Sequence, residues 1–593
     1  RRRRLKPRSS ERRGVPVSPG IAIGPAYVLR RERIVIPEHR IRDEQADGEV
    51  ERLRIAFGET RTKLEDIRRS MQGTGLVGTI FDAQFLFLED PTLLQHAESN
   101  IREQGLNAEW ALQRELRRLE ELFESMPDPY LRERASDIGF IVRRVLQALM
   151  GREPEGLRNA PPGVIVVAED LSPGEVAQVT RDSVAGFVTE SGSRTSHVTI
   201  MARSLEIPAV VAAGSELARE LVDGVTLILD GRTGRVIVDP DPSTIAEYRK
   251  QLADLKALSR ELLRYVDLPA ETKDGVAVRL LANVDQLEEA RDALRYGAEG
   301  IGLYRTEFLF LNRHDLPGEE EQREAYARIL AAVAPYSATI RTLDIGGEKV
   351  PTGLDLSDEA NPALGLRGVR MSHHRPDVFR TQLRALLRAS SAGKLKILLP
   401  MVSSLEEVEY ARAALEEAKR ELARERVSFD RDVPLGVMIE TPAAAMIVDL
   451  IAPLADFLSI GTNDLLQYTL AVDRSNEHVA YLYEPLHPAH IRMIQRIGQA
   501  ARRTGIVVGM CGEMAGDPLH SWILVALGIG ELSMAPFAIP LLKRILRDST
   551  AAEARELLTE VLRLGSPQEI RQRVERRMRE RFPVEFERIA LQG

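Results

Sequence analysis

A regular alternation of two kinds of segment organises the C-terminal half of the chain and limits its fold more than any other feature. From about residue 270, short apolar runs typical of strands are separated by longer, charged stretches with helical spacing. Eight parallel strands joined by helices predict a (β/α)8 barrel, with a doubly wound sheet as the alternative. The predicted strands are residues 278–284, 300–304, 339–344, 366–370, 397–401, 435–440, 457–461 and 507–511.

Polar residues at the ends of these runs favour the barrel. In a barrel the C-terminal ends of all the strands meet on one face, and that face carries the chemistry. One arginine or glutamate at a strand end is ordinary for a loop, but their recurrence across most of the strands predicts a single polar site. The residues are Arg305, Glu307, Arg341, Asp344, Arg367, Arg370, Glu440, Asn463, Asp464, Cys511 and Glu513, with Arg474 some residues after the seventh run.

The residue types at this face suit a small anionic substrate and a metal ion. Guanidinium groups bind phosphate and carboxylate through two parallel hydrogen bonds, so Arg305, Arg341 and Arg474 are candidates to hold the substrate. The carboxylates of Glu440 and Asp464 are hard oxygen ligands that suit Mg²⁺. An ion-pair network with the arginines is the alternative interpretation of these two carboxylates.

Composition limits where the chain works and what it binds. Cys511 is the only cysteine, which excludes an internal disulfide and predicts a reducing, cytoplasmic location. At the end of the last run its thiol is a candidate proton donor, with a buried, inert cysteine as the alternative. No apolar run approaches the roughly 18 residues of a membrane span. The net charge of −8 argues against a nucleic-acid-binding surface, and the basic residues 1–13 are interpreted as a disordered tail rather than a nucleic-acid-binding arm.

The residue pattern of the N-terminal half changes twice. Strand-like runs and turns give way to dense charge with helical spacing, and the strand pattern then returns. A helical module inserted into an α/β domain explains this order most simply, because both ends of the insertion fall at turn-rich boundaries. The predicted parts are a tail at 1–13, an α/β domain at 14–40 plus 151–241, a helical insertion at 41–150, a helical linker at 242–268 and the barrel at 269–593.

His197 is the candidate nucleophile of the α/β domain. It stands in a stretch, residues 191–203, where glycine and small hydroxyl residues precede it and apolar residues follow it. This pattern predicts a turn leading into a helix, whose free N–H groups would steady a phosphoryl group on the imidazole. Without the rest of the chain, a hydrogen-bonded structural histidine would be the more usual interpretation.

Taken together, the motifs resemble enzyme I of the bacterial phosphoenolpyruvate-dependent sugar phosphotransferase system. The resemblance extends from about Gly14 to about Pro540. Its motifs are Ser-Pro-Gly-Ile-Ala-Ile-Gly at 18–24, Arg-Thr-Ser-His at 194–197, Gly-Leu-Tyr-Arg-Thr-Glu-Phe-Leu at 302–309, Leu-Asp-Ile-Gly-Gly-Glu-Lys at 343–349, Asn-Pro-Ala-Leu-Gly-Leu-Arg at 361–367, Met-Ile-Glu-Thr-Pro-Ala-Ala at 438–444, Gly-Thr-Asn-Asp-Leu-Leu-Gln-Tyr at 461–468 and Met-Cys-Gly-Glu at 510–513.

The resemblance implies a phosphoryl relay. Phosphoenolpyruvate would bind with Mg²⁺ at the barrel mouth, His197 would attack its phosphorus, and the phosphohistidine domain would swivel to deliver the group to the small carrier protein HPr. Cys511 would protonate the enolate to give pyruvate. The helical insertion would dock HPr, with residues 81–91 as a family segment or simply helix core, and the barrel would form a homodimer. The substrate would meet Arg305, Arg341, Arg367, Lys349, Arg474, Asn463 and Asp464, and the metal would meet Glu440 and Asp464.

Departures from the family pattern leave these groups in place. Ser193 stands where a glycine is usual, Glu348 replaces a common aspartate, and Val176 falls where threonine is frequent. The alternatives are the nitrogen-regulatory paralogue, which usually carries an extra N-terminal domain, and a non-catalytic binding protein on the same fold. Pyruvate phosphate dikinase and phosphoenolpyruvate synthase share the modules but need an ATP-binding domain, for which this chain has no room.

Overall fold

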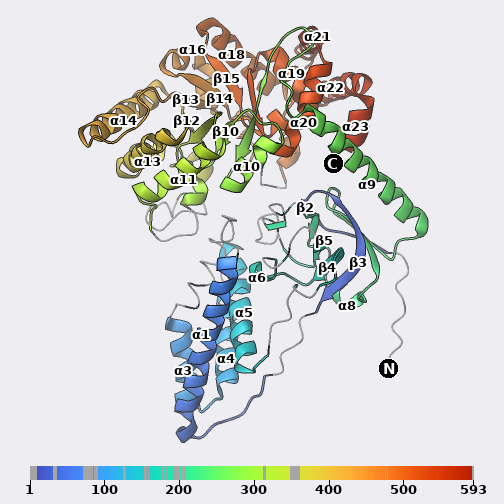
Figure 1. Ribbon diagram of the computed structural model, residues 1–593, viewed down its shortest axis with the longest axis vertical. Helices are drawn as coiled ribbons and strands as arrows, with labels where there is room; N and C mark the ends of the chain where they lie inside the picture. Colours follow the sequence, from blue (N-terminus) through green and yellow to red (C-terminus); the bar gives the residue numbers. More distant parts are fainter. Residues whose placement is uncertain are drawn as a thin grey trace. The chain divides into compact units, whose positions relative to one another are not determined.

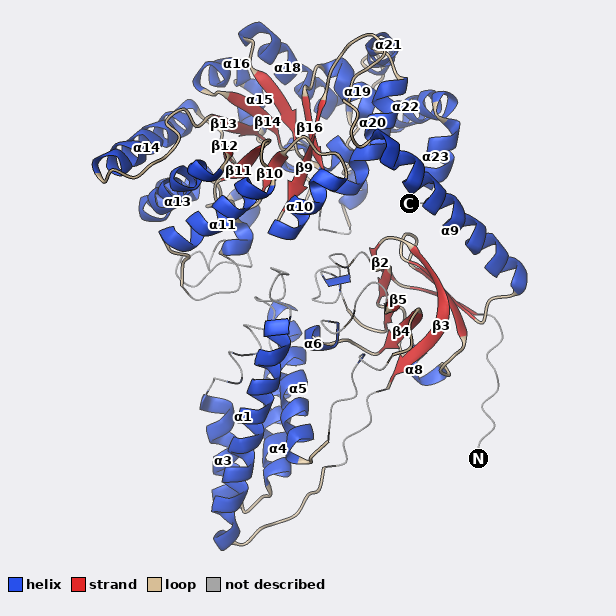
Figure 2. Ribbon diagram, viewed as in Figure 1, coloured by secondary structure: helices blue, strands red, loops and turns tan. Residues whose placement is uncertain are grey.

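The computed structural model divides into two compact units, residues 1–256 with 589–593 and residues 257–588 (Figures 1 and 2). The fold class predicted from the sequence is confirmed, because an α/β domain interrupted by helices is followed by a closed barrel. The structure describes residues 10–590 except 31–35, 71–84, 86–87, 89–90, 125–128, 153–156, 158–159, 177–178, 180–182, 193–198, 200, 203–204, 206, 311–314, 347–358, 360, 475 and 477.

The second unit is a barrel of eight parallel strands (Figure 2). The strands follow one another around the barrel in chain order, and β16 closes it by pairing with β9. They are β9 (Arg279–Val284), β10 (Ile301–Tyr304), β11 (Ser337–Arg341), β12 (Lys394–Leu399), β13 (Leu435–Ile439), β14 (Phe457–Ile460), β15 (Val507–Met510) and β16 (Glu531–Met534).

Helices connect the strands and continue beyond the last one. Their apolar residues recur at helical spacing, so one face of each long helix is buried. The helices are α10 (Leu287–Arg295), α11 (Glu319–Ala332), α12 (Val369–His374), α13 (Pro376–Ala389), α14 (Leu405–Arg424), α15 (Pro442–Met446), α16 (Val448–Ile451), α17 (Thr462–Leu470), α18 (Pro488–Thr504), α19 (Ser521–Leu527), α20 (Ile539–Asp548), α21 (Ala551–Val561), α22 (Pro567–Arg581) and α23 (Pro583–Ala590). Before the barrel the chain runs through α9 (Pro242–Leu262).

Two strand assignments from the sequence were wrong. Residues 366–370 are not a strand, because Gly368 takes a φ of 60° and α12 begins at Val369. The missing strand is β16, whose sequence Glu-Leu-Ser-Met alternates polar and apolar residues. Its polar members Glu531 and Ser533 line the interior of the barrel, so a search for apolar runs passes over it.

A buried histidine makes the stability of the barrel depend on pH. His490, in α18, is fully buried, and its Nδ1 lies 2.9 Å from the carbonyl oxygen of Pro485. Burial lowers the pKa of His490 to about 4. The ring is therefore neutral in the fold while the unfolded chain binds a proton below about pH 6.5, so stability is lost as pH falls from there towards 4.

Replacing His490 by glutamine should flatten this pH dependence. We expect the barrel transition of wild type to lose up to roughly 3 kcal/mol of stability between pH 6.5 and 4, and the variant to lose less. Calorimetry of the full chain over this range measures the difference. His374→Gln, at an exposed histidine at the end of α12, is the matched control. Some pH dependence should remain in the variant, because burial also lowers the pKa of His520. An equal dependence of stability on pH in wild type and His490→Gln would show that His490 does not contribute to it.

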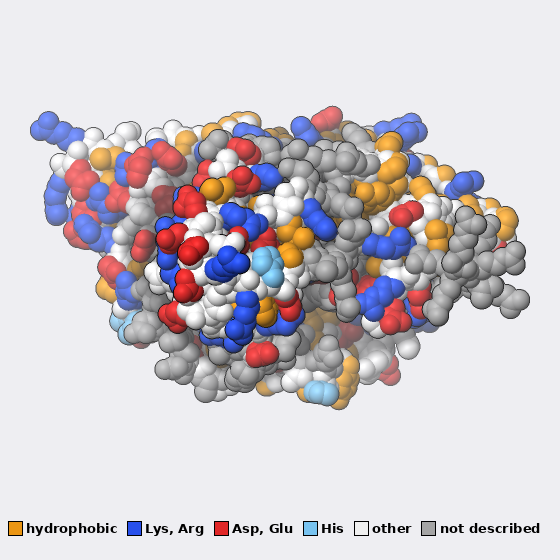
Figure 3. Space-filling view, turned by 90° about the horizontal axis from the view of Figure 1, so that it is seen from below, with side chains coloured by type: hydrophobic (Ala, Val, Ile, Leu, Met, Phe, Trp, Pro, Cys, Tyr) orange, Lys and Arg blue, Asp and Glu red, His pale blue; other side chains and the backbone are white. Residues whose placement is uncertain are grey.

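The described surface mixes charges of both signs. Figure 3 shows basic and acidic side chains interspersed on one face. Many of them form ion pairs, such as Arg54 with Glu98 at 2.7 Å and Arg380 with Glu421 at 2.8 Å. Within the described ranges, no helix is both long and apolar enough to cross a bilayer.

The first unit contains an eight-stranded mixed sheet of order β1-β8-β7-β3-β4-β5-β6-β2. Strands β3 to β6 are parallel to one another, and the remaining pairs are antiparallel. Short helices α6 (Pro173–Val176) and α8 (Leu217–Glu220) accompany it. The strands are β1 (Ser10–Arg13), β2 (Val15–Ser18), β3 (Ile21–Leu29), β4 (Val164–Ala168), β5 (Val184–Thr189), β6 (Ala209–Val211), β7 (Thr226–Asp230) and β8 (Arg235–Val238).

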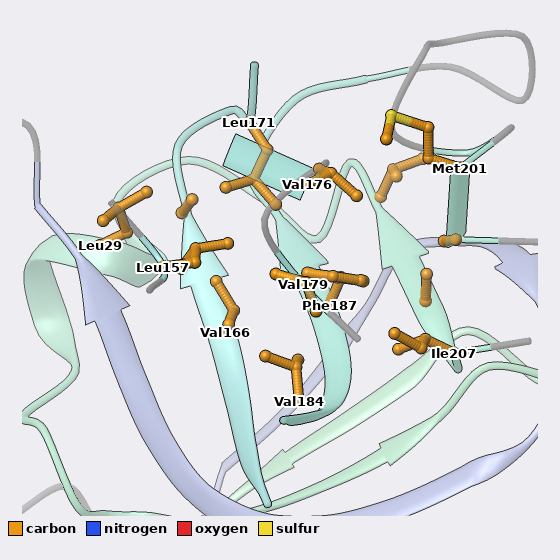
Figure 4. Packing of buried hydrophobic residues seen from close by; sticks show 14 of the residues in the cluster. Leu29, Leu157, Val166, Leu171, Val176, Val179, Val184, Phe187, Met201 and Ile207 are labelled. Carbon is orange, nitrogen blue, oxygen red and sulfur yellow. The ribbon is translucent and has the colours of Figure 1, made fainter. Parts of the chain in front are cut away.

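Both faces of this sheet are covered by apolar clusters. Alternate residues of a strand point to opposite faces, and β4 sends Val166 into one cluster and Ile165 and Val167 into the other. In the first cluster Val166 lies with Phe187 of β5 and with Met201, which follows the predicted nucleophile along the chain (Figure 4). Within the 191–203 stretch, Met201 is therefore anchored in the core.

The prediction of a disordered tail at 1–13 was wrong for residues 10–13. These residues form β1, which pairs antiparallel with β8 at the edge of the sheet. Glu11 accepts a hydrogen bond of 2.9 Å from Arg235, and Arg12 donates one of 2.8 Å to Glu220. Charged side chains suit an exposed edge strand, and here they find partners of opposite sign. Residues 1–9 lie outside the described residues.

Helices fill the chain between β3 and β4. They are α1 (Ala46–Ser70), α3 (Pro91–Gln104), α4 (Ala108–Glu124) and α5 (Pro129–Leu149), after a short 3₁₀ turn at Asp43–Gln45. Their buried faces meet in one cluster that includes Leu53, Leu112 and Val142. The helical spacing seen in the sequence thus becomes a packed bundle.

Candidate active site

Five of the predicted site residues lie at or just beyond the C-terminal ends of five barrel strands. Arg305 directly follows β10 and Arg341 ends β11. Glu440 follows β13, Asp464 lies in the first turn of α17, and Cys511 follows β15. Because the strands are parallel, these positions share one mouth of the barrel.

Arg341 is held between two acidic side chains. Its Nη2 donates to Oε1 of Glu307 at 2.9 Å, and its Nη1 lies 3.1 Å from Oδ2 of Asp344. Burial disfavours the charge, but the two carboxylates outweigh burial and raise the pKa of Arg341. The guanidinium is therefore charged at any working pH, and its two ion pairs orient it.

Asp344 joins a second arginine to the first. Arg367 donates from Nε to Oδ1 of Asp344 at 3.0 Å and from Nη2 to Oδ2 at 2.8 Å. The same guanidinium reaches Oδ2 of Asp464 at 3.4 Å and the hydroxyl of Tyr468 at 3.2 Å. Although burial acts against the charge of Asp344, the two arginines lower the pKa of its carboxyl. Asp344 thus fixes two cations side by side.

Glu440 is a carboxyl that the site makes hard to ionise. It is 1% exposed, and its Oε1 accepts a hydrogen bond of 2.6 Å from the backbone N–H of Met401. Burial, assisted by the negative charges of Asp464 and Asp344, raises the pKa of Glu440 to about 8. A nearby positive charge would reverse this effect.

Among the described residues, the buried part of the site contains more carboxyl groups than guanidiniums. Four carboxyl groups, those of Glu307, Asp344, Glu440 and Asp464, accompany the two guanidiniums of Arg341 and Arg367. Three buried polar atoms here have no hydrogen-bond partner among the described residues: Glu307 Oε2, Arg341 Nε and Thr462 Oγ1. Buried polar atoms are normally paired, so these unpaired donors and acceptors suit a bound anion together with a cation.

The protein by itself supplies few metal ligands. In the described part of the chain, no group of three or more His, Cys, Asp or Glu side chains is arranged to hold an ion. Glu440 and Asp464 are two hard oxygen donors whose charges act on one another. This donor set fits Mg²⁺, which usually keeps several waters and takes further oxygens from its substrate.

Cys511 is buried at 4% exposure beside this cluster. The Ser459 hydroxyl donates to its Sγ at 3.4 Å, and the Sγ lies 3.7 Å from the carbonyl oxygen of Ile460. Burial raises the pKa of the Cys511 thiol, with the charge of Glu440 adding to the effect. The thiol therefore carries its proton at neutral pH.

Three predicted residues lie at the rim. The Arg305 Nη1 donates to Asp285 at 3.1 Å. The Asn463 side-chain oxygen accepts from the backbone N–H of Glu513 at 3.1 Å. Arg474 is exposed, and its charge acts on the Tyr483 hydroxyl, which donates to the carbonyl oxygen of Asn463 at 3.1 Å.

Some predictions concern residues without a described position. His197 and Lys349 both lie outside the described residues, as do the substituted positions Ser193 and Glu348. Of residues 81–91, only Phe85, Leu88 and the backbone of Pro91 are described, and buried Phe85 belongs to the cluster around Val166. Val176 is fully buried in α6, so it acts as core there.

The structure adds residues to which the sequence analysis gave no role in the site. Glu307 and Asp344 were noted at strand ends without an assignment, Tyr468 appeared only as the last residue of the 461–468 motif, and Asp285 was not noted. Tyr468 stands four residues after Asp464 on α17, so both belong to one helix face. That spacing within the 461–468 motif is the signal that identifies it.

Comparisons with known proteins identify the family of the chain. Three family models match the chain: "PEP-utilising enzyme, N-terminal" at 13–134, "PEP-utilising enzyme, mobile domain" at 160–234 and "PEP-utilising enzyme, PEP-binding domain" at 259–551. The phosphoenolpyruvate-protein phosphotransferase of Geobacillus stearothermophilus is 43% identical over 559 residues, covering 94% of this chain and 96% of that protein. That of Bacillus subtilis (strain 168) is 41% identical over 563 residues, covering 94% and 98%.

A solution NMR structure of enzyme I is 34% identical with a TM-score of 0.35, covering 41% of this chain and 98% of that chain. The barrel and the three matching family models define a phosphoenolpyruvate-utilising enzyme. With relatives above 40% identity over nearly its whole length, the chain belongs to the phosphoenolpyruvate-protein phosphotransferase family and is an enzyme of that type. The resemblance inferred from the motifs is confirmed.

Proposed function

We propose that the chain transfers the phosphoryl group of phosphoenolpyruvate to His197 and then to the histidine of HPr, releasing pyruvate, as the first step of sugar uptake by the phosphotransferase system. One observation carries the substrate assignment. Asp344 holds the guanidiniums of Arg341 and Arg367 together at the barrel mouth, each within 3.1 Å of its carboxylate. Paired, oriented guanidiniums suit a compact substrate that carries both phosphate and carboxylate.

Binding and transfer divide among the chain's own residues. Arg305, Arg341, Arg367, Lys349 and Arg474 surround the substrate and neutralise its charge, with Asn463 beside the phosphate. His197 attacks the phosphorus through an imidazole nitrogen, and the bond to the enolate oxygen breaks. Cys511 donates its proton to the methylene carbon of the departing enolate, which becomes the methyl group of pyruvate.

Mg²⁺ is the cofactor that fits this donor set. Glu440 and Asp464 would hold it, and the mutual effect of these two carboxyl groups, which helps to raise the pKa of Glu440, supports the assignment. When bound, the ion supplies positive charge that stabilises negative oxygens of the substrate during transfer. Glu440 would then be ionised, because a neighbouring cation favours the carboxylate.

The parts of the chain are proposed to divide the work. Residues 14–40 plus 151–241 form the phosphohistidine domain, 41–150 the HPr-binding domain, 242–268 the linker and 269–593 the phosphoenolpyruvate-binding barrel. We propose a homodimer formed through the barrel and a cytoplasmic location. The curated relatives named above support the enzyme of the sugar branch, since both carry its general name.

A labelling chase tests the function. The chain is incubated with phosphoenolpyruvate carrying a labelled phosphoryl group and with Mg²⁺, freed of substrate, and mixed with HPr. We expect one label per chain that moves to HPr, with one pyruvate released for each label gained. Label that stays on the chain, or transfer that needs no Mg²⁺, would contradict the proposal.

A further inference from the structure

The interior of this barrel contains a polar pocket. Barrel interiors are usually filled by branched aliphatic side chains. Here Glu531, Ser533, Ser459 and Thr339 line a pocket with Gly302 and Gly509, together with Leu281, Phe457, Leu458 and Met510. Its size suits about one water molecule, and its hydroxyl and carboxyl groups supply the polar partners that a buried water needs.

Ser459 connects this pocket to Cys511. It stands on β14 at 5% exposure and lines the pocket, while its hydroxyl donates to Cys511 Sγ at 3.4 Å. A serine hydroxyl both donates and accepts, so it can receive a proton from one side as it releases one to the other. The thiol thus has a hydroxyl neighbour on the pocket side.

Gly509 keeps the space between Ser459 and Glu531 open. In the parallel register Gly509 of β15 lies opposite Ser459 on one side and Glu531 on the other. A Cβ added at Gly509 would lie 3.6 Å from Glu531 Oε2 and 3.4 Å from its Cβ, which is ordinary contact distance. Any other residue at 509 would therefore place its side chain against Glu531, from the strand that lies between those of Ser459 and Glu531.

Glu531 lies where the pocket approaches solvent. Its Oε1 accepts from Arg279 at 2.7 Å and lies 3.6 Å from the Lys396 ammonium. The Arg279 side chain is 43% exposed. Arg279 and Glu531 are the first residues of β9 and β16, so they lie at the end of the barrel opposite the mouth.

The chemistry requires a route for a proton. This step rests on the proposed function: each turnover in which Cys511 protonates the enolate leaves a buried thiolate. At the mouth that thiolate is near Glu440, Arg341 and Arg305, where substrate and product bind. A second route for the proton would allow the Cys511 thiol to be restored while substrate or product still occupies the mouth of the barrel.

We propose that Cys511 recovers its proton from the opposite end of the barrel, through Ser459 and the pocket beside Glu531. The Ser459 O–H bond breaks as the S–H bond forms, and the serine oxygen takes a proton from a water molecule in the pocket. That water is restored by a proton from solvent at the Glu531 end. One solvent proton is consumed for each pyruvate formed, and no electron is transferred.

Two variants interrupt the path in different ways, and one control leaves it intact. Ser459→Ala removes the hydroxyl, and Gly509→Ala fills the gap without changing any ionisable group. Thr339→Val is the control, because it removes a hydroxyl of the pocket wall on β11, which is not adjacent to β14 or β15. Calorimetry establishes that each variant is folded before kinetics are compared.

The readout separates the first turnover from later ones. Rapid mixing of the full chain with phosphoenolpyruvate and Mg²⁺ gives the first pyruvate, formed by a thiol that is already protonated. Excess HPr then gives the steady-state rate. We expect both path variants to form the first pyruvate at nearly the wild-type rate, and to slow in steady state by about tenfold or more with a larger solvent deuterium effect. The control should match wild type in both phases.

Other outcomes would overturn the path. If Ser459→Ala slows the first turnover as much as the steady state, the serine only orients the thiol. If both path variants turn over like wild type while Cys511→Ala forms no pyruvate, the thiol is the acid but its proton returns by the mouth. If Cys511→Ala forms pyruvate at the wild-type rate, the proposed acid itself is wrong, which distinguishes the two failures.

Discussion

His197→Ala is expected to abolish phosphorylation of the chain by phosphoenolpyruvate completely. Alanine has no nucleophilic nitrogen, and a covalent relay without its nucleophile has no intermediate to form. The neighbouring described residues indicate that the variant will fold. Gly192 takes a φ of 122°, and Thr199 and Met201, which flank the substituted position on its C-terminal side, are buried.

The measurement is the yield of label that is labile in acid and stable in alkali. His374→Ala removes an exposed histidine of the barrel and is the matched control, which should keep full yield. Calorimetric titration should find phosphoenolpyruvate still bound by the His197→Ala variant, because the barrel mouth is unchanged. A normal yield of label in that variant would refute the relay.

Glu440→Gln is expected to lower turnover by at least about 100-fold while making the metal-free protein more stable. Glutamine keeps the shape and the oxygen that accepts from Met401, but it lacks the charge that would hold Mg²⁺. The wild-type carboxyl has a pKa raised to about 8 by burial and by Asp464 and Asp344. Function and stability are therefore opposed at this residue.

The sign of the stability change depends on pH. The unfolded carboxyl ionises near its ordinary pKa of 4.5, whereas the folded one stays protonated up to about 8. As pH rises between these values, wild type loses stability that the glutamine variant keeps. The free energy of unfolding of the variant should therefore exceed that of wild type by up to a few kcal/mol at pH 8, and the two should be equal below pH 4. Calorimetry of the full chain with a metal chelator measures this difference.

A matched control isolates the effect of burial. Glu416→Gln changes a glutamate on α14 whose side chain is 58% exposed, and it should alter neither turnover nor the barrel transition by a measurable amount. A Glu440→Gln protein that is less stable than wild type at pH 8 would show that burying this carboxylate has no cost. A variant that retains normal turnover with Mg²⁺ would show that the carboxyl does not hold the metal.

Most of the architecture could be predicted because it depends on local patterns. Apolar runs bounded by turn residues identified seven of the eight barrel strands, and helical spacing identified the inserted bundle. Each error arises where the residue types of a segment do not match its conformation. Leu366-Arg367-Gly368 has the letters of a strand but a glycine in a left-handed conformation, and β16 has inward-facing polar residues where a strand search expects apolar ones.

The candidate site divides in the same way. Residue type and position at strand ends indicated Arg341, Glu440 and Cys511, and the motifs indicated the family. The partner of each group could not be predicted, because Asp344 and Tyr468 meet Arg367 from positions 23 and 101 residues away in the chain. Contacts of that range exist only after the barrel closes.

By itself, the sequence determined most of the strands and helices and which chemical groups stand at the strand ends, since both follow from neighbouring residues. Only the tertiary structure decided how those groups behave. Closure of the barrel removes Glu440 from water beside two other acids and raises its pKa, and it places Ser459 against the Cys511 thiol. Burial and long-range charge depend on distances between remote residues, and those distances are properties of the folded chain.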